Sequence, residues 1–346
     1  RYPSVQFCLY ADNFYKKAFK DIKNLIIYSS EDKEVKFWNK TLKHIKKTKN
    51  GFMERLMEKC DATVHIGGRV FIQHNDDYSA FLKADEDLRK FSKKVYLIGS
   101  NFGPYKDEQY YLDYHQLLST YDGVSFRDYY SYNKFKDIPH VVYAPDVVFN
   151  YQTDNSSNVE HRVLFSTISL AGRNDNFAII QYWEVYRKFI QKLAKRYLEL
   201  GYKITFLSFC EPQGDFYEIN EIVKTHDFDC FKDKIEINNY NGNIEESISL
   251  IKESEIIVGT RFHSIILGWL FNKPVLPIVY DNKTLQVLKD MNLKNYASLE
   301  ELEKVSIDDL IGNIEIVPSN QIAILKNSSK NHFKFFDLFI NESGNK

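Results

Sequence analysis

The sequence lacks three features that would assign it to other classes of protein. It contains no uninterrupted run of roughly 18 apolar residues, about the shortest stretch that spans a membrane as a helix. Its formal net charge is only −1, so it lacks the basic surplus with which general nucleic-acid binders neutralise phosphates. No metal-ligand spacing occurs, and the D-x-D pattern at 227–229 is expected by chance in an Asp-rich chain. We therefore expect no membrane span, no nucleic-acid partner and no metal.

Cysteine is scarce. The 4 cysteines, at 8, 60, 210 and 230, form no C-x-x-C or zinc-type pattern. We expect reduced, mostly buried thiols and a reducing compartment, the cytoplasm, while a disulfide between Cys210 and Cys230 stays open as the alternative. The sequence begins at Arg1 without a charged-then-apolar signal segment, and whether the natural N-terminus is missing stays open.

The content of the chain indicates a globular α/β protein of two domains. Its 346 residues suit two cores of about 150 residues each better than one. Short apolar runs alternate with longer helix-like segments, which is typical of a parallel sheet. In the first half these runs lie at 24–28, 62–66, 94–99, 123–126 and 141–144, and in the second at 162–168, 203–208, 235–237, 256–258 and 275–279.

A polar stretch at 151–160, rich in Asn and Ser, interrupts this alternation and is the best candidate linker. The predicted domains are thus 1–150 and 161–318, followed by a helical segment at 319–346. Two similar α/β halves predict two Rossmann-like domains facing a central cleft, as in GT-B folds. Ligands of such sheets bind at the carboxyl ends of the strands.

The segment 255–283 (EIIVGTRFHSIILGWLFNKPVLPIVYDNK) carries the strongest chemical signal. A short strand ends at Gly259, and Thr260 is the predicted N-cap of a helix that is apolar almost all round. Arg261 and His263 then fall in its first turn, where free N–H groups and the helix dipole favour an anion. The alternative is that Arg261 pairs with an internal carboxylate and His263 only caps a turn.

This segment resembles the C-terminal signature of polysaccharide pyruvyl transferases, which has R-x-H, an apolar helix, a proline and Tyr-Asp-x-Lys. Other segments resemble the family's motifs in the same order, and the resemblance covers roughly residues 60–285. These segments are 65–70 (HIGGRV), 99–105 (GSNFGPY), 125–128 (SFRD, with Tyr132 after it) and 144–146 (APD).

Two departures from the family pattern stand out. Many members open with a G-N-x-G-D-type loop that has no match here, and many have three glycines where Arg69 follows Gly67 and Gly68. A basic side chain in that loop could alter which acceptor fits.

The resemblance implies transfer of enolpyruvate from phosphoenolpyruvate to a sugar, in bacterial capsule or exopolysaccharide synthesis. Phosphoenolpyruvate is then a co-substrate, and no cofactor is expected. The expected acceptor is a sugar or lipid-linked oligosaccharide, which leaves a peripheral association with a membrane open. His263 and Arg261 are the predicted catalytic pair, and the donor-binding set is Arg261, His263, Arg173, Lys283 and Thr260.

Acceptor contacts are expected from loops of the first half. The predicted residues are Gly67, Gly68, Asn101, Phe102, Tyr105 and Asp146, with Tyr132 as a further aromatic platform. His65 is a lesser proton-transfer candidate, and Arg127 and Asp128 are expected to hold loops together through an internal ion pair.

Two other functions compete with this interpretation. A GT-B-type glycosyltransferase would place a nucleotide sugar where phosphoenolpyruvate is expected, and fold alone does not decide between them. The other is a catalytically silent relative that binds sugar or a partner, which buried and mutually satisfied Arg261 and His263 would favour.

Overall fold

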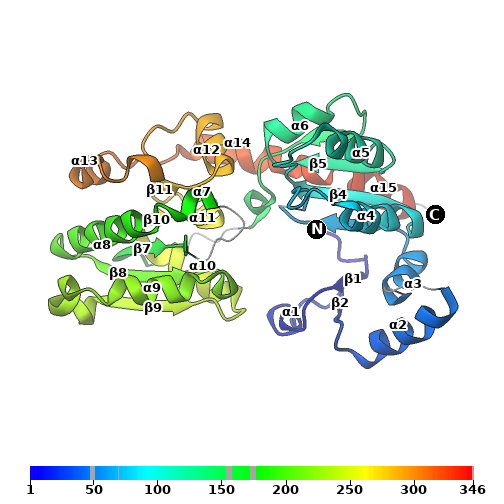
Figure 1. The fold of residues 1–346 in the computed structure, drawn as a ribbon, viewed down its shortest axis with the longest axis horizontal. Coiled ribbons are helices and arrows are strands. Elements are labelled where there is room, and N and C mark those ends of the chain that lie inside the picture. Colours follow the sequence, from blue (N-terminus) through cyan, green and yellow to red (C-terminus); the bar gives the residue numbers. More distant parts are fainter. Residues whose placement is uncertain (47–50, 69, 153–157, 172–176, 345–346) are drawn as a thin grey trace. The chain divides into compact units, whose positions relative to one another are not determined.

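The computed structural model describes residues 1–46, 51–68, 70–152, 158–171 and 177–344. The chain forms two compact units: unit 1 comprises Arg1–Val147 and Ser328–Lys346, and unit 2 comprises Val148–Asn327 (Figure 1). The chain therefore leaves unit 1 just before the polar stretch predicted as a linker. It returns to unit 1 at Ser328, inside the predicted C-terminal segment.

Unit 1 is built on a parallel sheet with strand order β3-β4-β5-β6. The sheet and its covering elements are β3 (Thr63–Ile66), α4 (Ser79–Phe91), β4 (Val95–Ser100), α5 (Glu108–Leu118), β5 (Gly123–Phe126), α6 (Tyr129–Phe135), β6 (Val141–Tyr143), η5 (Lys330–Phe333) and α15 (Lys334–Gly344). A separate two-stranded parallel sheet precedes them, formed with its helices by β1 (Phe7–Tyr10), α1 (Phe14–Ala18), β2 (Leu25–Tyr28), α2 (Lys33–Lys46) and α3 (Gly51–Lys59). The sequence analysis did not predict β1 or α4.

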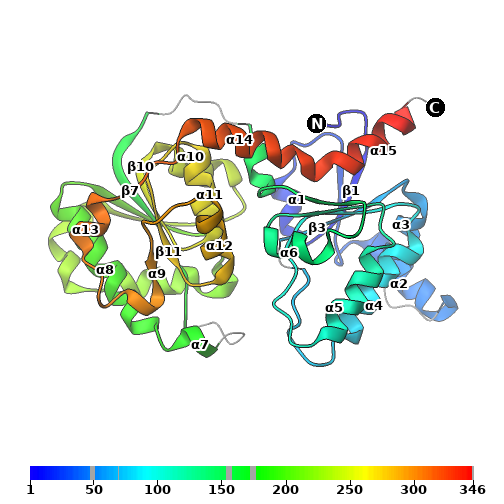
Figure 2. The same ribbon diagram turned by 90° about the horizontal axis from the view of Figure 1, so that it is seen from above.

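The C-terminal segment completes the core of unit 1. Helices α4 and α5 cover one face of the sheet, and α15 covers the other (Figure 2). Every residue of β4 is buried as a result, which explains why this strand reads as a continuous apolar run. A Cβ on Gly123 would lie 2.5 Å from the Cβ of Phe335, so α15 approaches β5 too closely for any side chain there.

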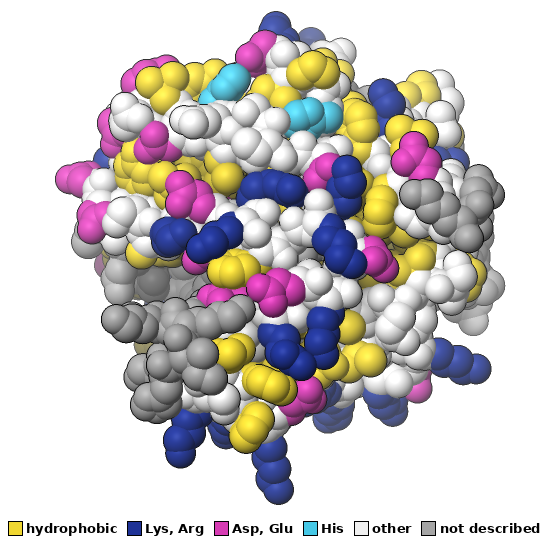
Figure 3. Space-filling model, turned by 90° about the vertical axis from the view of Figure 1, so that its right-hand side faces the viewer, with side chains coloured by type: hydrophobic (Ala, Val, Ile, Leu, Met, Phe, Trp, Pro, Cys, Tyr) yellow, Lys and Arg dark blue, Asp and Glu magenta, His cyan; other side chains and the backbone are white. Residues whose placement is uncertain are grey.

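Figure 3 shows the side chains on one face of the molecule. On the face drawn in Figure 3, basic and acidic side chains are interspersed among small apolar groups.

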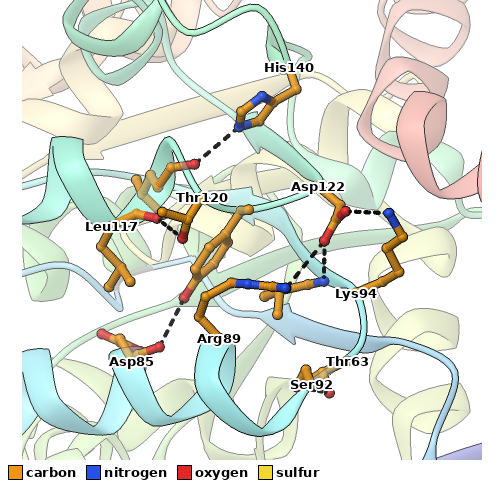
Figure 4. Close-up of polar contacts among 12 residues, drawn as sticks. Thr63, Asp85, Arg89, Ser92, Lys94, Leu117, Thr120, Asp122 and His140 are labelled. Carbon is orange, nitrogen blue, oxygen red and sulfur yellow. Dashed lines mark hydrogen bonds and ion pairs between the residues drawn. The ribbon is translucent and has the colours of Figure 1, made fainter.

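The amino ends of the unit 1 strands are closed by a satisfied polar network around Asp122 (Figure 4). The Asp122 carboxylate accepts from Lys94 Nζ at 2.8 Å, from the Val95 N–H at 2.9 Å and from Arg89 at 3.3 Å. It thereby joins the end of α4 to the starts of β4 and β5. This edge of the sheet has a structural explanation, so functional residues are better sought at the opposite, carboxyl edge.

Unit 2 has a six-stranded parallel sheet with the order β12-β11-β10-β7-β8-β9. Its strands are β7 (Glu160–Ser166), β8 (Lys203–Ser208), β9 (Ile235–Asn239), β10 (Ser254–Gly259), β11 (Val275–Val279) and β12 (Ala297–Ser298). Its α-helices are α7 (Phe177–Ile180), α8 (Trp183–Glu199), α9 (Asp215–Val223), α10 (Ile244–Glu253), α11 (Phe262–Leu270), α12 (Asn282–Asp290), α13 (Ile307–Gly312) and α14 (Ser319–Ser329). Short 3₁₀ turns are η1 (Val147–Asn150), η2 (Glu211–Gln213), η3 (His226–Lys234) and η4 (Leu299–Glu301).

The two hydrophobic cores of unit 2 lie on opposite faces of this sheet. One gathers around α8, and the other around α11, whose Trp269 is 2% exposed. A helix that is apolar all round is stable only when it is enclosed in this way. The prediction of an α/β chain with two Rossmann-like units, each on a parallel sheet, is therefore confirmed.

Two expectations about solvent and membrane can be compared with the structure. The 4 cysteines are free thiols, but Cys230 is exposed and the other three are only half-buried, so the expectation of mostly buried thiols is wrong. Within the described ranges, no helix has the length and apolar character to cross a bilayer.

Candidate functional site

The carboxyl edge of the unit 2 sheet brings together most of the predicted donor residues. Chain order reverses between β7 and β10, and ligands of doubly wound sheets bind at such a switch point. The loops after the two strands are joined directly, because the Thr260 N–H donates to the Ser166 carbonyl at 2.9 Å. Arg261 follows at once and precedes α11, so it lies at this switch point.

Arg261 is held by a carboxylate that the sequence analysis did not identify. Its Nε donates to Asp215 Oδ2 at 2.7 Å, its Nη2 donates to Asp215 Oδ1, and its Nη1 donates to Gln213 Oε1 at 2.7 Å. The Asp215 side chain is 0% exposed and that of Arg261 is 15% exposed. Burial alone would lower the pKa of Arg261, but the hydrogen bonds and charge of Asp215 raise it, so the guanidinium is always charged.

Arg261 pairs with an internal carboxylate, as one of the two hypotheses for this residue predicted. This pairing does not exclude the other hypothesis, that Arg261 binds an anion. A guanidinium has five N–H donors, and the bonds to Asp215 and Gln213 use three of them. Within the described residues, two N–H groups are left for a ligand. The bidentate contact also fixes the plane of the guanidinium, so those two donors point in a defined direction.

Thr260 does not cap α11, as the sequence analysis expected. The N-cap position is Arg261, and Thr260 is 1% exposed with its hydroxyl 2.9 Å from the Tyr186 hydroxyl. Tyr186 in turn accepts from the Ile168 N–H at 3.2 Å, and burial raises its pKa. This tyrosine of α8 therefore fixes both loops of the switch point, which removes Thr260 from the set of residues open to a ligand.

His263 and Lys283 both border the ring of Phe262. His263 is exposed in the first turn of α11, and its ring centroid lies 5.5 Å from that of Phe262. Lys283, in the first turn of α12, places its Nζ 3.4 Å from the centroid of the same ring. Asp281 caps α12 by accepting from the Thr284 N–H at 2.9 Å, which holds this turn in place.

Three buried hydroxyls at this edge have no hydrogen-bond partner in the described part of the chain. Ser166 and Thr167 close and follow β7, and Ser208 closes β8; all three are at most 1% exposed. Because an unpartnered buried hydroxyl destabilises the fold, it commonly marks the place of a ligand or ordered water. The signal in the sequence was a serine at the end of two buried strands.

Two further predictions concern Arg173 and a metal site. Arg173 lies outside the described residues. In the ranges that the structure describes, no group of three or more His, Cys, Asp or Glu residues is arranged to hold a metal ion. Asp229, from the D-x-D pattern, instead accepts from Lys232 and His226 at 2.9 and 3.1 Å.

In unit 1 the predicted acceptor motifs converge on Arg127, at the carboxyl end of β5. Its Nη1 donates to Asp146 at 2.7 Å and its Nε donates to Asn101 at 2.6 Å. Asn101 also donates to Asp128, which caps α6 by accepting from the Ser131 N–H at 2.7 Å. The expected ion pair between Arg127 and Asp128 is therefore wrong: the partner of Arg127 is Asp146.

The glycine pair belongs to the same cluster. A Cβ on Gly68 would lie 2.1 Å from an Nη atom of Arg127, and the Asn101 N–H donates to the Gly68 carbonyl at 3.0 Å. Gly67 precedes it in the loop. Gly68 is thus required because the guanidinium lies against its backbone.

Two acceptor residues need correction. Phe102 is 2% exposed and packs in the core of unit 1, so its ring offers no platform to a sugar. Asp146 is 4% exposed and its carboxylate is bound to Arg127. Its first role is therefore structural, and any role toward a sugar hydroxyl comes second. Tyr105 is half-buried, and its hydroxyl accepts from Lys134 at 2.6 Å.

A histidine far away in the sequence completes this cluster. His332, 4% exposed, places its two ring nitrogens 2.9 Å from Ser125 Oγ and 2.7 Å from the Pro145 carbonyl. Burial lowers its pKa to about 4. His65 lies elsewhere, half-buried on β3, with its Nδ1 3.6 Å from Asp85. No local pattern in the sequence indicates the position of His332.

Comparison with solved structures agrees with the fold found here. The UDP complex of MnaA from S. aureus aligns over 97% of this chain and 94% of that one, with a TM-score of 0.53 and 13% identity. UDP-GlcNAc 2-epimerase from Neisseria meningitidis gives 0.53 and 13% identity over 96% of this chain and 99% of that one. HepE from Anabaena, solved with UDP and glucose, gives 0.50 and 8% over 98% and 91%. These likenesses define the class: a GT-B-like α/β protein.

Within that class, the chain belongs to the polysaccharide pyruvyl transferase family, which its sequence matches over residues 6–282. It is 23% identical to the amylovoran biosynthesis protein AmsJ of Erwinia amylovora over 263 residues. That alignment covers 70% of this chain and 62% of AmsJ, so the match spans less than two thirds of this curated relative. The family predicted from the R-x-H segment is thereby confirmed.

Proposed function

We propose that this protein transfers enolpyruvate from phosphoenolpyruvate to a pair of sugar hydroxyls, forming a pyruvate ketal on a cell-surface polysaccharide or its precursor. The observation that carries the proposal is three buried hydroxyls, unpartnered within the described residues, at the same carboxyl edge of the sheet as Arg261. Ser166 and Thr167 are buried at the switch point and Ser208 is buried at the end of the neighbouring strand β8, where an anion would supply acceptors that they lack. Membership of the family supports the proposal that this anion is phosphoenolpyruvate.

The charge of the site suits a compact anion bound by several weak partners. Asp215 offsets the positive charge of Arg261. The main contribution of this arginine to the site is therefore its two directed N–H donors and not its net charge. The phosphate and carboxylate of phosphoenolpyruvate therefore need further support from Lys283 and from the N-terminus of α11. Arg173 is a further proposed donor ligand, on the grounds of the family resemblance.

The reaction requires two protons to be moved. One sugar hydroxyl bonds to C2 of the enol while C3 takes up a proton and becomes a methyl group; the second hydroxyl bonds to C2 as the C–O bond to phosphate breaks. The two sugar hydroxyls together lose two protons. One corresponds to the proton gained by C3, and the other leaves with the phosphate. His263, exposed beside Arg261, is the proposed proton carrier, since a histidine can exchange protons near neutral pH.

The acceptor is proposed to bind to unit 1 as a sugar or lipid-linked oligosaccharide. Gly67, Gly68 and Asn101 would shape the loop, and Arg127 would hold it by its bonds to Asn101 and Asp146. In this assignment Asp146 positions Arg127. It is too well paired to act as a free base.

The test is acceptor-dependent release of phosphate from phosphoenolpyruvate with a panel of sugars, for the full chain and for Arg261→Lys and His263→Ala. We expect Arg261→Lys to lose at least about 100-fold in kcat/KM, because lysine keeps the charge but loses the fork geometry. His263→Ala should lower kcat more than it raises KM.

Arg187→Ala is the matched control. Arg187 forms a comparable bidentate pair in unit 2, with Nε and Nη2 donating to Glu218 at 2.7 and 2.9 Å, but it joins α8 to α9. This variant should release phosphate at the wild-type rate. Absence of release by the wild type, together with turnover of a nucleotide sugar, would establish the glycosyltransferase alternative instead.

A further inference from the structure

A groove of about 430 Å³ lies at the open edge of the unit 1 sheet, and nothing in the function proposed above uses it. Strand β6 is the last strand of that sheet and forms the floor of the groove. Tyr143 of β6 lines the groove with residues of α6 and of the C-terminal segment, which are Tyr129, Tyr132, Asn331 and Lys334. The volume falls within the range of about 300–1,000 Å³ that is typical of small-molecule sites.

Aromatic rings dominate this groove. Tyr129 and Tyr143 stack with their centroids 3.8 Å apart and an interplanar angle of 21°, and Tyr132 lies 6.4 Å from Tyr143. Tyr129 nevertheless remains 44% exposed. A stacked pair of partly exposed rings offers a flat apolar surface. The phenol hydroxyls at its edge remain in contact with water.

The polar groups that line the groove are donors and acceptors with little charge. Phenols both donate and accept hydrogen bonds, and so does the amide of Asn331. Lys334 is the one charged residue among the described lining residues, and no carboxylate lines the groove. The lining thus suits a ligand with an apolar face and many hydroxyls, either neutral or negatively charged.

The groove adjoins the acceptor cluster along the chain. Tyr129 directly follows Asp128, the cap of α6 that Asn101 binds, and Tyr143 ends β6 just before the segment 144–146. The groove and the cluster are thus formed by neighbouring residues at the ends of β5 and β6.

We propose that this groove is a second sugar-binding subsite, which holds a neutral or acidic sugar of the acceptor glycan away from the reacting hydroxyls. The identification of that glycan as the acceptor rests on the function proposed above, whereas sugar binding by the groove does not. Binding energy from such a remote sugar would position the reacting sugar and favour oligosaccharides over single sugars.

The experiment is saturation-transfer NMR and calorimetry on the full chain without phosphoenolpyruvate. The probes are short oligosaccharides of glucose, galactose and their uronic acids. We expect Tyr129→Ala to weaken binding about tenfold, because it removes half of the stacked surface. Lys334→Gln should weaken the uronic acid probes more than the neutral ones.

Tyr130→Ala is the matched control, since Tyr130 is on the same helix, is 53% exposed and does not line the groove. It should bind every probe as the wild type does. Circular dichroism of each variant establishes that it is folded. Failure of all the oligosaccharides to bind, or equal binding by wild type and Tyr129→Ala, would overturn the proposal. Binding of an extended peptide to the β6 edge in competition with the sugars would also overturn it, because the groove would then be a peptide site.

The outcomes also separate this proposal from the proposed function. Oligosaccharide binding that depends on Tyr129, in a chain that releases no phosphate from phosphoenolpyruvate, leaves the subsite established and the pyruvyl transfer refuted. Phosphate release with no Tyr129-dependent binding gives the reverse result.

Discussion

Arg261 and Asp215 form a bidentate ion pair across the switch point of unit 2, although 46 residues separate them in the sequence. Asp215 begins α9 and is completely buried, and its Oδ2 also accepts from the Cys210 N–H at 3.1 Å. The most suggestive arginine of the chain therefore has its orientation set by a carboxylate from the neighbouring βα connection. This relationship leads to the first prediction.

Replacement of Asp215 by alanine should destabilise unit 2 by about 3–5 kcal/mol, because it leaves the Arg261 charge buried and unpaired. Asp215→Asn keeps one acceptor and should be milder. Both variants should bind phosphoenolpyruvate more weakly, as measured by calorimetry. Glu218→Ala, which breaks a similarly buried pair with Arg187, is the control. It should lose comparable stability in urea unfolding but keep its affinity; equal loss of affinity would show that the Asp215 effect is only structural.

Gly68→Ala should destabilise unit 1 by roughly 1–3 kcal/mol, because the added methyl group collides with the Arg127 guanidinium. Displacement of Arg127 also breaks its bond to Asp146. Thermal unfolding measures the loss. The control is Gly312→Ala in α13, where a Cβ meets nothing within 4 Å and should be neutral or slightly stabilising. A wild-type melting temperature for Gly68→Ala would contradict the contact.

Asp85 should make the protein less stable as pH rises. Burial raises its pKa from 3.8 to about 6, although Tyr114 donates a hydrogen bond to it at 3.0 Å. A carboxyl whose pKa is higher in the folded state contributes stability at low pH, and that contribution is lost as pH rises through 6. At pH 7 the loss is about 3 kcal/mol.

Asp85→Asn should therefore unfold at a higher urea concentration than the wild type at pH 7.5, and the advantage should shrink toward pH 4. Asp87→Asn, on the exposed side of the same helix, supplies the comparison. A constant difference between Asp85→Asn and the wild type across this pH range would refute the assigned pKa.

His332 should have the opposite effect. Its folded pKa of about 4 lies below the ordinary 6.5, so its contribution is fully present above pH 6.5 and is lost as pH falls toward 4. The loss amounts to about 3 kcal/mol. We expect His332→Gln to be less stable than wild type at pH 7 but flatter in its acid dependence, as measured by urea unfolding from pH 7 to 4.5. His226→Gln, with a fully exposed side chain, should unfold with the wild-type profile.

Much of the fold follows from local patterns. Buried parallel strands are continuous apolar runs, and the ten predicted strand runs correspond to β2–β11. Strand β1 was not predicted although its four residues are apolar, and neither was α4, in which 6 of 13 residues are charged. The R-x-H segment likewise indicated a buried helix headed by polar residues, since α11 has no polar face to confuse the pattern.

The functional site was harder to predict from local sequence patterns. Asp215 and Tyr186 follow or precede no motif, and their roles depend on which loops meet at one edge of the sheet. Phe102 illustrates the opposite error: an aromatic residue in a loop motif was expected to meet a sugar, yet its ring fills the core. Sequence spacing does not specify on which side of a loop a ring lies.

The sequence alone determined the class of the chain, because alternation of apolar runs and the ordered motifs are local properties that persist in any arrangement of the elements. Tertiary structure decided which charges are paired and which donors remain for a ligand. Arg261 with Asp215, Arg127 with Asp146, and His332 under the segment 144–146 are pairings between distant segments. The order of the strands brings them together, and burial then makes each pairing necessary, since a charge or polar group removed from water must find its partner in the fold.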